Sequence, residues 1–413
     1  MSRKFYGLLG RKLGHSYSVP VHNAFGCMDY VLQELEPEEI KTFLSRDDLG
    51  GVNVTIPYKR DVMPFCKLTK AAEAIGSVNT ILPQPDGTLL GDNTDLYGFV
   101  SMAKRAGIDF AGKKVVILGS GGASLAVRAG AEEMGAAEIV VVSRTGEYNY
   151  GNVELWNDAQ ILVNSTPVGM YPKPGASLVD LRDFPKLEGV LDLIYNPLRT
   201  ALILQARELG IPALGGLSML VWQGKAAEER FFGREISEEE AEEAMRGIVR
   251  DTENIVLIGM PGCGKSTIGE ALRKLTGREI VDLDACISES AGMSIPEIFA
   301  SKGETVFRAI EHEEIVKAGM QHGKILVTGG GAVTVSENLP ALRQNGRVYH
   351  IERKIEELPV AGRPISQKTP PAELYKKRLP MYEAFRDAVI ENNGTPMEAA
   401  EKIWRDFCEN PGD

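Results

Sequence analysis

The sequence is poor in several features that would place a protein in a particular class. Its 413 residues hold five cysteines, an odd number with no C-x-x-C pair, so neither a disulfide framework nor a thiolate metal site is indicated. No apolar run is long enough to span a membrane, and the basic start lacks the apolar core of a secretory signal. The net charge of −11 disfavours a nucleic-acid surface. We therefore expect a soluble, cytoplasmic protein that binds small molecules; no oligomeric state is indicated.

A phosphate-binding motif is the most specific pattern in the chain. IVLIGMPGCGKST, residues 255–267, is a β-branched run that ends in G-x-x-x-x-G-K-S, and the helix-like stretch after it closes at Gly277. In such a loop backbone N–H groups surround phosphate oxygens, Lys265 reaches the β- and γ-phosphates, and Ser266 holds Mg²⁺. The alternative is a glycine-rich turn before an ordinary helix. The nucleotide-binding residues expected here are Gly259, Gly262, Cys263, Gly264, Lys265, Ser266 and Thr267.

The first hundred residues alternate short apolar strands with helix-like stretches, which predicts an open α/β sheet. Small hydroxyls and amides stand where the strands end, the place where such sheets bind ligands, and they suit a small polyhydroxylated substrate. Each of them alone is equally well explained as a turn residue or a helix cap. They include Ser16, Ser18, Asn53, Thr55 and Asn79.

Two charged residues in this region are candidates for acid–base chemistry. Lys59 follows Pro57, and Asp95 closes an Asn-Thr-Asp turn. We interpret them as a pair beside the substrate, with Lys59 donating or accepting a proton at an oxygen and Asp95 tuning it. The alternative is a surface salt bridge, which spacing alone does not exclude.

A second glycine-rich motif follows. Residues 113–118 form an apolar run that enters GSGGAS, and an alanine-rich helix and a strand at 138–142 come next, as in the first βαβ unit of a dinucleotide-binding fold. Where an acidic residue would hold the ribose of NAD, the chain has Ser143-Arg144-Thr145, which suits a 2′-phosphate. NADP is therefore favoured over NAD; the alternative is an arginine that covers the sheet edge.

The end of this half carries a helix signal. Ser237 and Glu240 form a capping box that predicts an acidic helix as far as about Arg250. Residues 251–254 are then left as a linker.

The motifs of the first 250 residues occur in the order HSYS, NVTIPYK, SVNT, NTD, GSGGA, SRT, NSTPVGM, YNP and GGLSMLVWQ. This part of the chain resembles the shikimate dehydrogenase family along its whole length. The resemblance implies NADPH-dependent reduction of 3-dehydroshikimate to shikimate, with Lys59 and Asp95 as the catalytic pair. It implies substrate contacts from Ser16, Ser18, Thr55, Asn79, Tyr195 and Gln223. It implies NADP(H) contacts from Gly119, Ser120, Gly121, Gly122, Ala123, Ser143, Arg144, Thr145 and Gly216. Val19, Leu96, Ser143 and a shortened segment at 146–160 depart from the family pattern.

From Asn254 onward the chain resembles the shikimate kinase family, through VDLDACI, SIPEIFASKGETVFRAIE, VTGGGAV, GRPIS and KKRLPMY. The resemblance implies that Asp284 accepts the hydrogen bond of the attacking hydroxyl and that Asp282 lies near Mg²⁺ through water. Because side chains alternate along a strand, these two should point to opposite sides unless the strand ends between them. The resemblance also implies shikimate contacts from Asp284, Arg308, Gly330, Gly331 and Arg378, and a catalytic lid arginine, Arg363, that acts with Lys265. Without the resemblance each arginine would be assigned to the solvated surface.

Together these patterns predict an α/β protein with a two-domain dehydrogenase followed by a P-loop domain like the nucleoside monophosphate kinases. We expect a substrate-binding domain at 1–100, completed by helices within about 217–250, a Rossmann NADP-binding domain at 101–216, a linker at 251–254 and the kinase domain at 255–413. The predicted function is bifunctional: NADPH-dependent formation of shikimate, then its ATP-dependent phosphorylation at the 3-hydroxyl. The alternatives are an NAD-dependent quinate or shikimate dehydrogenase fused to a kinase, and a regulator that binds these ligands without turnover.

Overall fold

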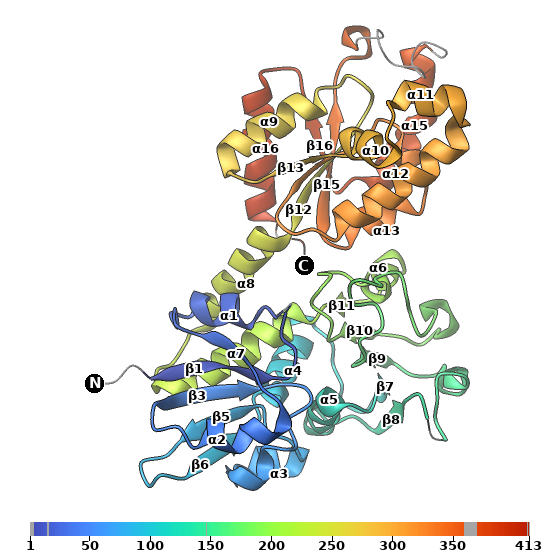
Figure 1. The fold of residues 1–413 in the computed structure, drawn as a ribbon. Coiled ribbons are helices and arrows are strands. Elements are labelled where there is room, and N and C mark those ends of the chain that lie inside the picture. The colour runs from blue at the N-terminus through green and yellow to red at the C-terminus, as the bar shows by residue number, and fades with distance from the viewer. Residues whose placement is uncertain (1–3, 15, 146, 359–369, 411, 413) are drawn as a thin grey trace. The chain divides into compact units, whose positions relative to one another are not determined.

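The structure, a computed structural model, describes residues 4–14, 16–145, 147–358, 370–410 and 412. It divides into a first unit of Met1–Met170, Ala176–Tyr195 and Leu202–Ile248, and a second unit of Tyr171–Gly175, Asn196–Ala201 and Val249–Asp413. The described residues form three sheets with helices against them, so the predicted α/β class is confirmed (Figure 1).

The first sheet is mixed and has the strand order β2-β1-β3-β5-β6-β4. Its strands are β1 (Phe5–Gly10), β2 (Val31–Glu34), β3 (Leu49–Val54), β4 (Lys67–Leu68), β5 (Thr80–Pro83) and β6 (Leu89–Asp92). Strands β1, β2 and β3 run parallel, and β5 lies antiparallel to both β3 and β6. The helices of this region are α1 (Ser18–Ala24), α2 (Ile40–Leu44) and α3 (Lys70–Ile75).

The second sheet is entirely parallel, in the order β11-β10-β9-β7-β8. Its strands are β7 (Lys114–Leu118), β8 (Glu138–Val142), β9 (Ile161–Asn164), β10 (Gly189–Asp192) and β11 (Ala213–Leu214), and its helices are α4 (Asp95–Arg105), α5 (Gly122–Glu133) and α6 (Ala201–Glu208). Along β7, Val115 and Ile117 belong to one hydrophobic cluster and Val116 and Leu118 to another. Both faces of this sheet are therefore buried, which explains the continuous apolar runs in the sequence.

Helix α7 (Leu217–Phe232) follows the second sheet in sequence and packs in the region of the first, against α1, α4, β3 and β5. A Cβ at Gly98 of α4 would lie 2.6 Å from the carbonyl oxygen of Met219, so glycine is needed where α4 and α7 meet. The next helix, α8 (Glu238–Thr252), begins with the predicted capping box: the backbone N–H of Glu240 donates to Ser237 Oγ, and that of Ser237 donates to the Glu240 carboxylate, both at 3.1 Å.

The expected linker at 251–254 was wrong. Helix α8 continues to Thr252, and strand β12 already begins at Asn254, where the backbone N–H donates to the carbonyl of Asn345 at 2.8 Å. The last helical turn persists because the N–H of Glu253 donates to the carbonyl of Val249. Helix and strand are thus joined almost directly.

The third sheet is also parallel, in the order β13-β14-β12-β15-β16. Its strands are β12 (Asn254–Ile258), β13 (Ile280–Asp282), β14 (Ile325–Val327), β15 (Gly346–Glu352) and β16 (Ala388–Glu391). The helices are α9 (Lys265–Thr276), α10 (Leu283–Ala291), α11 (Ile295–Ser301), α12 (Gly303–Gly319), α13 (Asn338–Arg343), α15 (Pro371–Phe385) and α16 (Pro396–Glu409). Strand β12 is the central strand and is buried throughout, so the loop that follows it starts from a fixed position.

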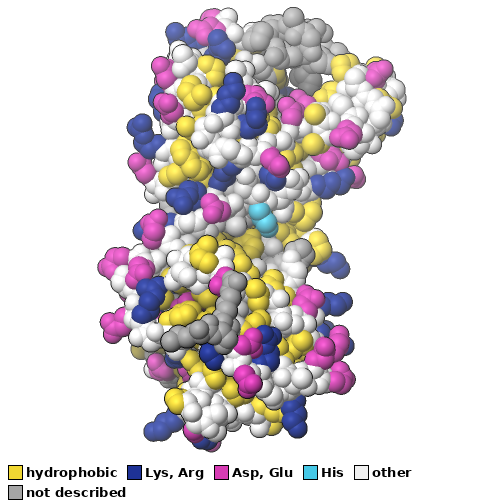
Figure 2. Space-filling model, turned by 60° about the vertical axis from the view of Figure 1, so that its left-hand side comes forward, with side chains coloured by type: hydrophobic (Ala, Val, Ile, Leu, Met, Phe, Trp, Pro, Cys, Tyr) yellow, Lys and Arg dark blue, Asp and Glu magenta, His cyan; other side chains and the backbone are white. Residues whose placement is uncertain are grey.

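The surface carries charges of both signs. On the face drawn in Figure 2, Lys and Arg side chains are interspersed with Asp and Glu side chains. Within the described part of the chain, no helix combines the length and the apolar character that crossing a membrane requires.

Candidate active sites

Lys59 and Asp95 form a largely buried ion pair in the first unit. Lys59 Nζ donates to Asp95 Oδ2 at 2.5 Å, and the two side chains are only 14% and 9% exposed. Lys59 lies in the loop after β3, and Asp95 is the first residue of α4. An exposed salt bridge contributes little and is easily screened, whereas a pair this deep is fixed in place. The structure therefore brings together the two residues that the sequence suggested for proton transfer.

Asn79 holds the second carboxylate oxygen of Asp95. Its Nδ2 donates to Asp95 Oδ1 at 2.9 Å and to Thr94 Oγ1 at 3.0 Å, while its Oδ1 accepts from the backbone N–H of Thr94 at 2.7 Å. The backbone N–H of Asp95 donates to Asn93 Oδ1 at 3.0 Å. The Asn-Thr-Asp turn is thus fixed by side chains as well as by its own backbone.

The other predicted substrate residues lie on several elements. Ser16 Oγ donates to Ser18 Oγ at 3.0 Å at the start of α1. Burial raises the pKa of Tyr195, with Tyr17 and Ser16 acting in the opposite direction. Gln223 of α7 accepts from Thr94 Oγ1 at 3.4 Å, which ties it to the Asp95 turn. Thr55 follows β3, and its backbone N–H donates to the carbonyl of Leu9.

Helix α7 also supplies charged side chains that sequence reasoning missed. Arg230 donates to the carboxylate of Asp92, whose other oxygen accepts from Thr69 Oγ1 at 2.6 Å. Lys225, which is only 6% exposed, donates to Tyr97 Oη at 3.2 Å. Charged residues inside the apolar pattern GGLSMLVWQGKAAEERFF were the available signal, because charges on a buried face require partners.

The glycine loop after β7 adjoins the ion pair. Helix α5 begins at Gly122, and a Cβ at that residue would lie 3.8 Å from Lys59 Cδ. Gly119 has φ +108°, and a Cβ there would lie 2.8 Å from Ser165 Oγ, so this turn requires glycine. The N-terminus of a long helix attracts phosphate groups through its free N–H groups. Gly119, Ser120, Gly121, Gly122 and Ala123 thus occupy positions that fit a dinucleotide beside Lys59.

The residues expected at the ribose lie at the same sheet edge. Ser143, Arg144 and Thr145 follow β8, the parallel neighbour of β7, and Ser143 Oγ donates to the carbonyl of Thr145 at 2.7 Å. Arg144 is exposed, as a residue available to a 2′-phosphate must be. Gly216 has a packing explanation instead: a Cβ there would lie 2.0 Å from the carbonyl oxygen of Leu193.

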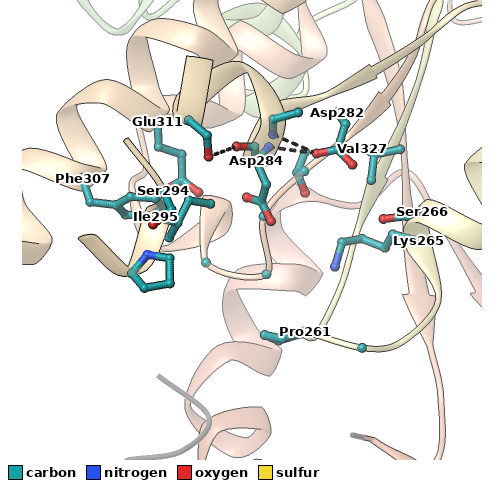
Figure 3. Close-up of a pocket in the computed structure, with 18 of the residues that line it drawn as sticks. Pro261, Lys265, Ser266, Asp282, Asp284, Ser294, Ile295, Phe307, Glu311 and Val327 are labelled. Atoms are coloured by element: carbon teal, nitrogen blue, oxygen red, sulfur yellow. Dashed lines mark hydrogen bonds between the residues drawn. The ribbon is translucent and has the colours of Figure 1, made fainter. Parts of the chain in front are cut away.

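The second unit contains a cavity of about 870 Å³ above the P-loop (Figure 3). Five of the predicted nucleotide residues line it: Gly262, Gly264, Lys265, Ser266 and Thr267. Gly259 and Cys263 do not. Gly259 lies against the carbonyl of Ile351, and the buried Cys263 accepts from Asn392 Nδ2 at its carbonyl at 2.7 Å.

Asp282 and Asp284 both line this cavity, because the strand ends between them, the case in which the two need not point to opposite sides. Strand β13 ends at Asp282, which caps α10 by accepting from the backbone N–H groups of Asp284 at 3.0 Å and Ala285 at 3.2 Å. Figure 3 shows these bonds, with Asp284 near Lys265 and Glu311. The Lys265 ammonium is turned onto its own loop, donating to the carbonyls of Gly259 at 2.8 Å and Met260 at 3.1 Å.

Burial in the protein raises the pKa values of two carboxyl groups that line the cavity. Desolvation raises the pKa of Asp284, with Lys265 acting in the opposite direction. Burial also raises the pKa of Glu311, against the effect of Arg308. Arg308 Nη1 donates to Glu311 Oε2 at 2.5 Å, so the guanidinium is anchored from behind.

The glycine triplet 329–331 brings the backbone against three site residues. A Cβ at Gly329 would lie 2.9 Å from Asp284 Oδ1, one at Gly330 would lie 2.5 Å from the Pro261 ring, and one at Gly331 would lie 2.3 Å from Arg308 Nη2. Arg378 donates to the carbonyl of Gly330 at 2.9 Å. The predicted substrate residues of this unit are therefore brought together around one backbone segment.

The cavity wall contains further residues that were not predicted individually: Ile295, Pro296, Phe299, Phe307 and Arg353. The apolar ones come from SIPEIFASKGETVF, a stretch that was assigned only as a whole. Arg363 lies outside the described residues.

Mg²⁺ takes few protein ligands and keeps several waters, so it needs no dedicated cage. Within the described ranges no group of three or more His, Cys, Asp and Glu side chains could hold a metal. Ser266 and Asp282, which both line the cavity, fit the sparse ligation of Mg²⁺ at a bound nucleotide.

The first unit has the fold and the site of a dinucleotide-dependent dehydrogenase, and the second those of a P-loop kinase. Three family models match the chain: the shikimate dehydrogenase substrate binding domain at residues 8–81, the shikimate 5′-dehydrogenase C-terminal domain at 216–246, and shikimate kinase at 261–408. The chain belongs to the shikimate dehydrogenase family, with a shikimate kinase domain following the dehydrogenase in the same polypeptide.

Individual relatives agree with this assignment. The shikimate dehydrogenase (NADP(+)) of Clostridium perfringens is 38% identical, over 56% of this chain and 93% of its own length. A chorismate mutase/shikimate 5-dehydrogenase fusion protein from Clostridium acetobutylicum is 35% identical in its crystal structure, with a TM-score of 0.57 over 60% of this chain and 98% of that one. The Thermus thermophilus shikimate 5-dehydrogenase, solved with NADP(H) and shikimate, is 32% identical, with a TM-score of 0.54 over 59% of this chain and 99% of that one.

Proposed function

We propose that this chain catalyses two consecutive reactions on one small molecule. The first unit reduces 3-dehydroshikimate to shikimate with NADPH, and the second transfers the γ-phosphoryl group of ATP to the 3-hydroxyl of shikimate. The observation that carries the proposal is the buried Lys59–Asp95 pair, which adjoins a dinucleotide-type glycine loop. The same chain also carries a P-loop cavity lined by Arg308 and Arg378.

In the reduction, NADPH supplies a hydride to the ketone carbon when it is bound. The Lys59 ammonium would hydrogen-bond the ketone oxygen and give it a proton as the negative charge develops there. Asp95 accepts from Lys59 at 2.5 Å, which fixes the direction of the ammonium. Ser16, Ser18, Thr55, Asn79, Tyr195 and Gln223 supply the hydroxyl and amide groups that a polyhydroxylated carboxylate needs once water is displaced.

In the phosphorylation, the P-loop and Lys265 would hold the phosphates, and Ser266 and Asp282 would hold Mg²⁺, which offsets charge on the phosphates when bound. Asp284, which lines the cavity, would accept the hydrogen bond of the attacking hydroxyl and take its proton. Arg308 and Arg378 bind the substrate carboxylate, and the backbone of Gly330 and Gly331 closes around it. The lid role of Arg363 stays a prediction.

NADP is the proposed cofactor because Arg144 is exposed at the edge where the adenosine ribose of a Rossmann dinucleotide lies. An NAD-dependent quinate or shikimate dehydrogenase would need an acidic group there. A regulator without turnover would have no need of Lys59, Asp95, Lys265 and Asp284 together. The five free cysteines support the proposal of a reducing, cytoplasmic compartment.

The two activities should be separable by substitution. Lys59→Met should slow turnover in the ketone reduction by about a hundredfold or more while shikimate phosphorylation continues at its normal rate, because only the proton donor is removed. Asp284→Asn should have the reverse effect. Steady-state assays of each half-reaction provide the measurement. The matched control is Lys67→Met, because the side chains of Lys67 and its partner Asp86 are 65% and 59% exposed. Loss of both activities in either variant would contradict independent sites.

The cofactor preference should depend on Arg144. Arg144→Gln should raise the KM for NADPH by about tenfold and leave the KM for NADH unchanged, because a charge-assisted hydrogen bond to the 2′-phosphate is lost. Initial rates with each cofactor measure this. Arg128→Gln, which removes an exposed arginine paired with Glu132 on α5, is the control. Equal changes for the two cofactors would contradict the assignment of Arg144.

Carboxylate binding in the kinase unit should require the fork of a guanidinium at position 308. Arg308→Lys should raise the KM for shikimate by about tenfold or more, while the KM for ATP stays unchanged, because lysine does not reproduce a bidentate contact. Arg347→Lys changes an arginine of the same unit that pairs with Asp406 at 2.8 Å and does not line the cavity, so it is the control. A rise in the KM for ATP alone would place Arg308 at the nucleotide instead.

A further inference from the structure

A chain of buried hydrogen bonds leads to Asp95 from Tyr30, the residue before the edge strand β2 of the first sheet. Tyr30 Oη donates to Asn53 Oδ1 at 2.8 Å, Asn53 Nδ2 donates to Thr80 Oγ1 at 3.1 Å, and Thr80 Oγ1 donates to Asn79 Oδ1 at 2.9 Å. Asn79 Nδ2 then donates to Asp95 Oδ1 at 2.9 Å. The members, all at most 7% exposed, are Tyr30, Asn53, Thr80, Asn79 and Asp95.

Every link in this chain runs in one direction. The ionised carboxylate at its end only accepts hydrogen bonds, so Asn79 must present its NH₂ group to Asp95. The oxygen of the Asn79 amide then accepts from the Thr80 hydroxyl at 2.9 Å, a shorter contact than the 3.3 Å between Thr80 Oγ1 and Thr94 Oγ1. The Thr80 oxygen is left to accept, and Asn53 meets that need with its own NH₂ group. The Asn53 oxygen in turn accepts from Tyr30, a residue with a hydroxyl proton to give.

The Thr80, Asn53 and Tyr30 links thus support, from residues that do not touch the ion pair, the same orientation of the Asn79 amide that Asp95 and the backbone N–H of Thr94 require. A flipped amide would place its oxygen 2.9 Å from Asp95 Oδ1, where two acceptors repel each other. It would also turn the NH₂ group toward the backbone N–H of Thr94, which now donates to Asn79 Oδ1 at 2.7 Å. The Asp95 carboxylate therefore keeps its direction toward Lys59 only when the Asn79 amide has this orientation.

The Tyr30 end of the chain is anchored by helices α1 and α7. The Tyr30 ring stacks on His22 with centroids 3.7 Å apart and an interplanar angle of 5°. His22 Nδ1 lies 2.5 Å from Glu228 Oε1, and both side chains are at most 1% exposed. A Cβ at Gly224 would lie 2.6 Å from Val21, so α1 sits close on α7 at this point. Neither His22 nor Glu228 has a part in the proposed chemistry, and holding Tyr30 gives this buried pair a role.

We propose that Thr80, Asn53 and Tyr30 are positioning residues for the reduction: their one-way hydrogen-bond chain holds the Asn79 amide in the orientation that aims Asp95 at Lys59. The inference rests on the proposed dehydrogenase function. It extends the site to three residues that touch neither the substrate nor the cofactor.

The direct test compares Thr80→Val with Thr80→Ser in the full chain. Valine keeps the shape of threonine and removes the hydroxyl, whereas serine keeps the hydroxyl. We expect Thr80→Val to lower kcat for the ketone reduction by about tenfold, with the KM for NADPH within about twofold of wild type, because small misplacements of a catalytic group cost rate. Thr80→Ser should restore kcat to within about twofold. Rates are taken well below the melting temperature of each variant, so that loss of folded protein does not enter kcat.

A second pair of variants tests the same chain should Thr80→Val fail to fold. Tyr30→Phe keeps the stack on His22 and removes the first donor, and it should lower kcat by several-fold, on the order of the Thr80→Val effect. Tyr58→Phe is its control, since Tyr58 is equally buried in the same unit but donates to the backbone carbonyl of Leu35 at 2.6 Å.

An unchanged kcat in Thr80→Val or Tyr30→Phe would overturn the inference, as would an equal loss in Thr80→Ser or in Tyr58→Phe. These results would not contradict the proposed function, because in each of them the wild-type chain still reduces 3-dehydroshikimate. A wild-type chain that fails to reduce 3-dehydroshikimate contradicts the proposed function itself.

Discussion

The dehydrogenase site depends on one packing interaction, the return of helix α7 to the first sheet. Gln223 reaches Thr94, Lys225 reaches Tyr97, Arg230 reaches Asp92, and Glu228 reaches His22. These contacts join residues that lie 128 to 206 positions apart in sequence. They hold both the turn that carries Asp95 and the helix that carries Ser18. A buried charge without a partner destabilises the folded state. The bonds that fix the site therefore also stabilise α7 in this position.

In the kinase unit the corresponding constraint is close approach of backbone to side chain. The central strand β12 fixes the start of the P-loop, and the glycine triplet 329–331 lies so close to Asp284, Pro261 and Arg308 that an added Cβ would displace them. The nucleotide side and the substrate side of the cavity thus share a wall. Tyr382 donates to the carbonyl of Gly330 at 2.6 Å and, with Arg378, holds that wall from behind.

Much of this arrangement follows from the sequence. Both glycine loops were predicted from their motifs, and the Lys59–Asp95 pair from a lysine after Pro57 and an aspartate in an Asn-Thr-Asp turn, all at ends of predicted strands. The positions of Asp282 and Asp284 required knowing that β13 ends at Asp282, which a one-residue change in a strand boundary decides. The bounds of the linker were predicted wrongly for the same reason: neither proline nor glycine marks the end of α8 in the sequence. The partners of Glu228 and Arg230 were out of reach because pairing across more than a hundred residues leaves no local pattern.

The central claim is that a single chain forms shikimate and then phosphorylates it. The most direct measurement is one reaction containing 3-dehydroshikimate, NADPH, ATP and Mg²⁺, followed by NADPH absorbance and by mass spectrometry of the products. We expect NADPH oxidation together with the appearance of shikimate 3-phosphate. NADPH oxidation that ends at shikimate, or phosphorylation of added shikimate without any NADPH oxidation, would contradict the claim.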